Sequence, residues 1–154
     1  MEEDEYKSTY SELASVRCVF EKALTNHQAK CDLSRHFCLA DREGYSCEDA
    51  EASLKCSKLL EKLREKSIFV LKLRDIDGPL PHNMEIRVQA GGLAGLVKLL
   101  DAGPQNSLQQ TLMVAGIDQI ISRALEHYGT LDDLPYSEII QSVVQFQGRG
   151  RRQR

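Results

Sequence analysis

The stretch that decides the fold of the first half of this chain is CDLSRHFCLADREGYSC, residues 31–47. Before it, a stripe of mainly apolar positions recurs every three or four residues, as on one face of an amphipathic helix: Leu13, Val16, Phe20, Leu24, His27 and Cys31. Cys38 lies seven residues after Cys31, on the same face if the helix continues. Residues 40–45 are polar and include Gly44, which indicates a turn. The pattern predicts a helix that continues past Cys31 and turns near Gly44.

A second helix is predicted to begin near Ser46. Ser46 and Asp49 approximate a capping box, and acidic residues fill the first turn, where they suit the positive end of the helix dipole. The inward stripe of this helix is Ala52, Cys56, Leu59, Leu60, Leu63 and Ser67. Residues 67–74 either prolong the helix or form a strand, because a short apolar run fits both. Residues 8–74 are therefore expected to form a cysteine-bearing helical hairpin.

The second half begins after the loop 75–83, in which Pro79 and Pro81 end any helix or central strand. Residues 84–89 alternate apolar and polar side chains, as a strand does, and they can pair with residues 69–73 in a small β-hairpin. Glycines at 91, 92 and 95 are explained by tight packing, since the phosphate-binding motifs GxGxxG and GK[ST] are absent. Helices are predicted over 90–100, over 108–128 with Gly129 at its end, and after Pro135.

The predicted fold class is mainly α: the cysteine-bearing helical hairpin is followed by a C-terminal helical bundle over 84–146, with room for one small β-hairpin. A single globular domain spans residues 8–146, between an acidic tail at 1–7 and a basic tail at 147–154. The chain has 154 residues, of which 42% are hydrophobic and 28% charged, the balance of an ordinary globular protein. Its apolar runs are all shorter than the roughly 20 residues of a membrane span, so we expect no membrane partner.

The compartment bears on the chemistry of the cysteines. The first residues are acidic and are not followed by an apolar segment, so we expect no signal peptide and a cytoplasmic protein. Reducing compartments disfavour structural disulfides, and clustered cysteines there are more often metal-binding or catalytic. The net charge of −3 argues against wholesale non-specific binding of nucleic acid.

Five cysteines crowd into the first half of the chain, and the last four have the spacing C-x6-C-x8-C-x8-C. Thiolates are soft donors, and four of them complete a tetrahedral zinc site or hold an iron–sulfur cluster. The predicted ligands are Cys31, Cys38, Cys47 and Cys56, with an iron–sulfur cluster favoured over zinc because all four are cysteines and widely spaced. Cys18 lies off the helical stripe and is expected outside the set, while His27 or His36 can replace one thiolate.

The predicted helix imposes a condition on this site. In an unbroken helix Cys31 and Cys38 stand about 10 Å apart along the axis, which is too far for ligands of one centre. A shared centre therefore requires the helix to break between them. Two alternatives need no break: disulfides Cys38–Cys47 and Cys31–Cys56 across an antiparallel hairpin, or free thiols packed as small apolar residues.

The leading functional hypothesis is a small metal-centre protein, more an accessory factor than an enzyme, that acts as a redox carrier, sensor or assembly factor with a protein partner. A second hypothesis is an adaptor or regulator whose basic tail contacts nucleic acid or an acidic partner through Arg149, Arg151, Arg152 and Arg154. A third is a helical scaffold held by disulfides.

Overall fold

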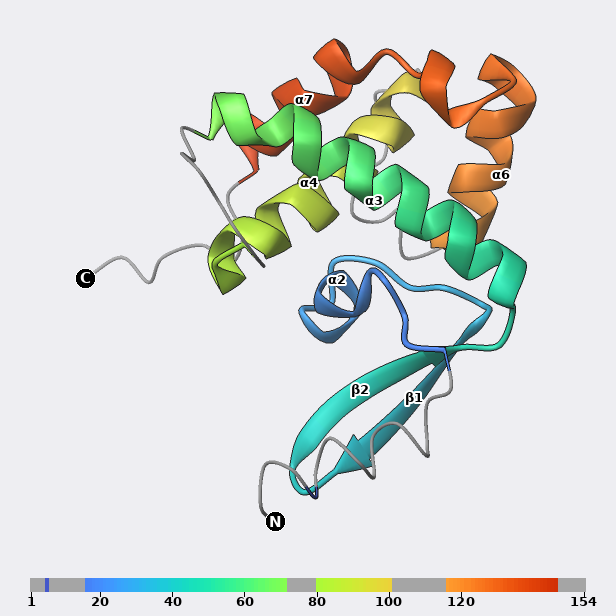
Figure 1. The fold of residues 1–154 in the computed structure, drawn as a ribbon, viewed down its shortest axis with the longest axis vertical. Helices are drawn as coiled ribbons and strands as arrows, with labels where there is room; N and C mark the ends of the chain where they lie inside the picture. Colours follow the sequence, from blue (N-terminus) through green and yellow to red (C-terminus); the bar gives the residue numbers. More distant parts are fainter. Residues whose placement is uncertain (1–4, 6–15, 72–79, 101–115, 147–154) are drawn as a thin grey trace.

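The computed structural model describes residues 5, 16–71, 80–100 and 116–146 (Figure 1). Its elements, in chain order, are α2 (Glu21–Thr25), β1 (Ser34–Leu39), β2 (Arg42–Cys47), α3 (Ala50–Val70), α4 (His82–Leu100), α6 (Ile117–Tyr128), the 3-10 turn η1 (Leu131–Asp133) and α7 (Tyr136–Gln145). The fold is mainly α with one small antiparallel sheet, as the sequence predicts. Apart from Glu5, both predicted tails lie outside the described residues, as does the predicted helical stretch before Ile117.

The β-hairpin replaces the predicted helix over residues 31–38, so the expectation of a helical hairpin over 8–74 is wrong. The two strands pair with Leu39 opposite Arg42 and Ser34 opposite Cys47. Ala40 and Asp41 form the connection with φ of 50° and 66°, the left-handed conformation that two-residue hairpin turns use. The only helical part of the predicted first helix that the structure describes is α2, after which His27 takes a φ of 56°.

Residues 84–89, predicted to be a strand, belong to α4. Val88 is fully buried, and the buried positions continue at helical spacing through Leu93, Leu96 and Val97. The predicted partner strand is also helical as far as it is described, because α3 continues to Val70. Residues 84–89 thus form part of an amphipathic helix, although their apolar and polar residues alternate as in a strand.

The other predicted helices are confirmed for the described residues, except that α3 begins at Ala50 and Ser46, predicted to cap it, lies in β2. Asp49 caps α3, because its Oδ1 accepts the N–H groups of Glu51 and Ala52 at 2.9 and 3.2 Å. Leu59, Leu60, Leu63 and Ser67 are buried on the predicted face of α3. Gly129 ends α6 with a φ of 88°, and α7 follows Pro135.

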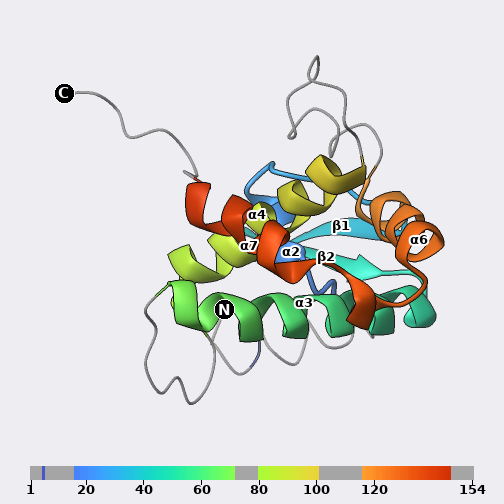
Figure 2. The ribbon, with the colours of Figure 1, turned by 90° about the horizontal axis from the view of Figure 1, so that it is seen from above.

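The core lies among α3, α4, α6 and α7, and Figure 2 shows α3 running along one side of the molecule beneath α4 and α7. The helices α4 and α7 approach closely because glycines face α7. A Cβ at Gly95 would lie 2.8 Å from the carbonyl oxygen of Ile139, and one at Gly91 would lie 2.7 Å from the Cα of Val143. Tight packing therefore explains these glycines, as predicted, although the partner is a helix.

A buried polar chain joins three helices. The guanidinium of Arg64 on α3 donates hydrogen bonds to both carboxylate oxygens of Glu85 on α4, from Nε at 3.0 and 3.1 Å. Gln89, one turn further along α4, donates to Glu85 at 3.0 Å and accepts the backbone N–H of Ala23 on α2 at 3.1 Å. The positions of α2 and α3 are thereby fixed relative to α4.

Within the described residues, no helix has both the length and the apolar composition needed to cross a membrane.

Replacing Gly95 with alanine should lower the free energy of unfolding by about 2 kcal/mol, although alanine is the better helix former by about 1 kcal/mol. The new methyl group would meet the backbone of α7, which cannot rotate away. Chemical denaturation measures the change. Gly92→Ala is the matched control, because its Cβ meets the side chain of Leu63, which can move. Equal effects of the two substitutions would contradict the close backbone contact.

Candidate metal centre

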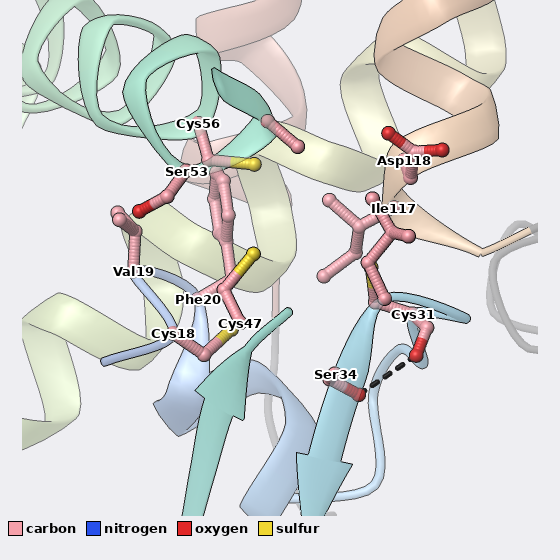
Figure 3. Close-up of a pocket in the computed structure, with 12 residues that line it drawn as sticks. Cys18, Val19, Phe20, Cys31, Ser34, Cys47, Ser53, Cys56, Ile117 and Asp118 are labelled. Atoms are coloured by element: carbon pink, nitrogen blue, oxygen red, sulfur yellow. Dashed lines mark hydrogen bonds between the residues drawn. The ribbon is translucent and has the colours of Figure 1, made fainter. Parts of the chain in front are cut away.

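Four cysteines from four segments of the chain line one pocket: Cys18 before α2, Cys31 in the loop before β1, Cys47 at the end of β2 and Cys56 on α3. Figure 3 shows Cys18, Cys47 and Cys56 grouped on one side of this pocket, with Cys31 beside Ile117 and Asp118 on the other. Each of the four is half-buried. We call this group the pocket cysteines.

The base of the β-hairpin holds two of the pocket cysteines in place. Cys18 donates its N–H to the carbonyl oxygen of Tyr45 at 3.0 Å, and Cys47 donates to that of Val16 at 2.7 Å. The segment before α2 thus runs along the outer edge of β2. Phe20, two residues after Cys18, is fully buried in the core and lines the floor of the pocket.

The first turn of α6 holds a third pocket cysteine, Cys31, in place. The N–H of Ile117 donates to the carbonyl oxygen of Lys30 at 2.8 Å, so the first turn of this helix is docked against the loop that carries Cys31. Ser34 closes the same loop, because its hydroxyl donates to the carbonyl oxygen of Cys31 at 2.7 Å. Cys31 therefore lies at a helix N-terminus, where the helix dipole favours a negative charge.

Backbone N–H groups point at the sulfur atoms. The backbone N–H of Phe20 lowers the pKa of Cys18, and those of Leu33 and Asp118 lower the pKa of Cys31. All three bonds favour the thiolate over the thiol. Such N–H···S bonds are among the protein's means of tuning a bound metal–sulfur centre.

Burial opposes the thiolate more strongly than these bonds favour it. Burial raises the pKa of the Cys18 and Cys56 thiols to about 12 and also raises the pKa of Cys31; the other pocket thiols add to each shift. None of the described residues that line the pocket is basic, and most of the others are apolar, among them Val19, Leu33 and Ile117. Burial therefore favours the protonated thiol at Cys18, Cys31 and Cys56, and a nearby cation would favour the thiolate.

The pocket has a small enclosed part and an open side. Its cavity volume is about 20 Å³, enough for about one water molecule. The pocket is reached from the surface through its open side.

Three of the four predicted ligands meet here, and the fourth does not. Cys38 lies near the turn of the β-hairpin, opposite Glu43, and is exposed, whereas Cys47 is opposite Ser34 at the other end. Cys18, which was expected outside the set, lines this pocket together with Cys31, Cys47 and Cys56, and Cys38 lies apart from them. Neither histidine proposed as a substitute lines the pocket. The helix that would have had to break between Cys31 and Cys38 does not form, because Cys31 lies in a loop and Cys38 in β1.

The cysteines of the alternative disulfide scaffold are all free thiols in the structure. The strand register also separates Cys38 from Cys47. Cys38 is opposite Glu43, four residues before Cys47, and Cys47 is opposite Ser34, four residues before Cys38. The predicted Cys38–Cys47 bridge is incompatible with this hairpin.

Cys18 was missed because its exclusion rested on a helical stripe that does not form. The sequence did contain a signal for the hairpin. Phe37 and Leu39 alternate with polar residues, as in a strand, and only two residues lie between this run and Arg42, where the second strand begins. The signal is weak, because Ala-Asp lacks the Asn-Gly chemistry that identifies such turns.

No family model matches this chain, and neither a curated protein nor a solved structure shows significant similarity to it. The predicted arginines at 149, 151, 152 and 154 lie outside the described residues.

In metal-free protein at pH 8, an alkylating reagent should modify Cys38 much faster than Cys18 or Cys56. Cys38 is exposed, whereas burial raises the pKa of the other two to about 12 and leaves very little thiolate. Each cysteine falls in its own tryptic peptide (18–22, 31–35, 36–42, 43–55 and 56–58), so mass spectrometry follows all of them separately. Equal rates in protein that keeps its helical circular dichroism would contradict the buried pocket.

Proposed function

We propose that this protein binds an iron–sulfur cluster through Cys18, Cys31, Cys47 and Cys56 and acts as a redox, sensor or accessory factor. The observation that carries the proposal is the convergence of four cysteines from four separate segments on one pocket that opens to the surface. Free thiols used only as apolar filling need no such convergence. Four thiolates are the usual ligand set of both common cluster types.

The sulfur atoms are spaced more widely than a single tetrahedral zinc ion requires. Around a tetrahedral zinc, cysteine sulfurs stand about 3.8 Å apart. The part of the chain that the structure describes contains no three pocket cysteines whose sulfur atoms all lie within 4.8 Å of one another. A cluster carries its irons at separate corners, and its cysteine ligands are correspondingly further apart.

The surroundings of the sulfurs support a metal over a reactive thiol. A nucleophilic cysteine needs a lowered pKa, usually from a neighbouring base or cation, and here burial raises the pKa of three pocket thiols. The N–H groups of Phe20, Leu33 and Asp118 stabilise thiolates without adding a full positive charge. This combination suits sulfur atoms whose charge is balanced by bound iron.

The half-buried position of the centre supports a role that involves a partner. All four pocket cysteines are partly exposed, so a bound cluster would lie close to the surface. Electrons or small oxidants would reach it without a conformational change. The proposed partner is a protein that docks over the open side of the pocket.

Substituting any pocket cysteine with serine should remove the centre, and Cys38→Ser should leave it intact. The test is iron and acid-labile sulfide content, with a UV–visible spectrum, on protein purified without oxygen. Cys38→Ser is the matched control, because it removes a thiol from the same hairpin but not from the pocket.

Three outcomes would overturn the assignment. A centre retained in Cys18→Ser, or lost in Cys38→Ser, would contradict the ligand set. Wild-type protein that is folded but free of both iron and zinc would contradict the metal centre itself. Zinc alone in the wild type would indicate a structural site in place of a redox one.

Affinity for a cation in the pocket should rise with pH. In the metal-free protein the pKa values of Cys18 and Cys56 are about 12, so near neutrality both thiols keep their protons. Binding requires thiolates and releases those protons, so affinity should increase at least about a hundredfold per pH unit between about pH 6 and 8. Zinc titration of the Cys38→Ser variant against a competing chelator measures this, and a pH-independent affinity would contradict it.

A further inference from the structure

We propose that His36, Cys38 and Glu43 form a second, separate metal site at the tip of the β-hairpin, which binds a single zinc-like divalent ion. The ligand atoms of these three side chains all lie within 4.8 Å of one another. His36 Nε2 and Glu43 Oε1 are 3.6 Å apart. The site uses none of the pocket cysteines and goes beyond the function proposed above.

The strand register places the three donors on one face. Cys38 and Glu43 are directly opposite each other, and His36 lies two residues before Cys38 on the same face of β1. Tyr45, opposite His36, has its ring centroid 4.9 Å from the imidazole centroid, which limits the positions the histidine can take.

The backbone hydrogen bonds bring these side chains closer still. Tyr45 directs its carbonyl oxygen outward to Cys18, and its N–H is donated to Glu21 Oε1 at 3.1 Å. Tyr45 is therefore at a non-hydrogen-bonded position with respect to β1, and so is Glu43, two residues earlier. Side chains of such pairs stand closer together than those of hydrogen-bonded pairs.

The donors match a borderline divalent ion. A thiolate, an imidazole and a carboxylate are the three protein ligand types of zinc, and three such ligands leave a fourth position for water or another ligand. Around tetrahedral zinc the donor atoms stand roughly 3.3–3.8 Å apart, so small side-chain rotations complete the site. His36 and Glu43 are 44% and 47% exposed, so an ion reaches them directly from solvent.

The two sites differ in the chemistry of their sulfur atoms. The pocket offers four thiols in apolar surroundings, whereas Cys38 has a nitrogen and an oxygen donor beside it and water around it. A four-sulfur set suits a soft, iron–sulfur type centre, and a mixed N, O, S set suits a single borderline ion. Neither site shares a ligand with the other, so loss of one leaves the other in place.

Zinc protection of Cys38 from alkylation tests this site. The tryptic peptide 36–42 contains Cys38 as its only cysteine, so its modification is counted independently of the pocket. Increasing free zinc should slow alkylation of this peptide in the wild-type chain. In His36→Gln and in Glu43→Gln the half-protective zinc concentration should rise at least about tenfold, since even indirect partners of a metal are worth about 10–100-fold. His127→Ala, which removes a histidine from α6, should match the wild type.

Two results would overturn the second site. Half-protection at the same zinc concentration in His36→Gln and Glu43→Gln would show that the thiol binds zinc by itself. An unchanged alkylation rate at all zinc concentrations would show that the three side chains hold no ion. Because the pocket centre is measured by iron and sulfide, failure here and failure of the proposed function are separate outcomes.

Discussion

The buried carboxylate of Glu85 is the constraint on which the arrangement of this molecule depends. It lies 4% exposed on α4, with the guanidinium of Arg64 on one side and the amide of Gln89 on the other. A carboxylate so deeply buried is tolerated only with close hydrogen-bond partners, although Arg64 itself is partly exposed. Arg64 belongs to the helix that carries Cys56, and Gln89 holds the backbone of α2, which follows Cys18. The polar chain thus sets the relative positions of two pocket cysteines.

Backbone hydrogen bonds hold the other two parts of the pocket, the β-hairpin and the start of α6, in place. The β-hairpin is attached along its outer edge to residues 16–18, which brings Cys47 to Cys18. The first turn of α6 docks on Lys30, which brings Cys31 to a helix N-terminus. Gly116, just before α6, has a φ of 85°, and a Cβ there would lie 3.4 Å from the carbonyl oxygen of Lys30. A side chain at this position would be strained by the positive φ, so glycine permits the docking.

The sequence predicts the helices well, except for the first turns of α4, and the hairpin poorly, for a physical reason. α3 and α7 carry long apolar stripes and clear end signals, and their burial decides their conformation. Residues 34–47 have neither a long apolar stripe nor clear end signals. Their pairing is fixed by a turn at Ala40 and Asp41 that few sequence rules identify, and by tertiary hydrogen bonds to residues 16–18 and Glu21. The same reason limits the prediction of the pocket. Three of its cysteines were predicted to come together, whereas the position of Cys18 depends on tertiary contacts that no local sequence pattern encodes.

Cys47 and Cys38 lie at opposite ends of the hairpin, which explains why their surroundings differ although both are in the same strand pair. Both belong to one face of the sheet, Cys47 opposite Ser34 and Cys38 opposite Glu43. At the base, this face is covered by α3 and by the start of α6, so Cys47 is half-buried among apolar side chains. At the tip the described helices no longer cover it, and Cys38, His36 and Glu43 are exposed. Burial therefore decreases along a single sheet face, from the half-buried Cys47 among apolar side chains to the exposed Cys38 beside polar donors. The hairpin thus presents two cysteines in chemically different environments on one continuous face.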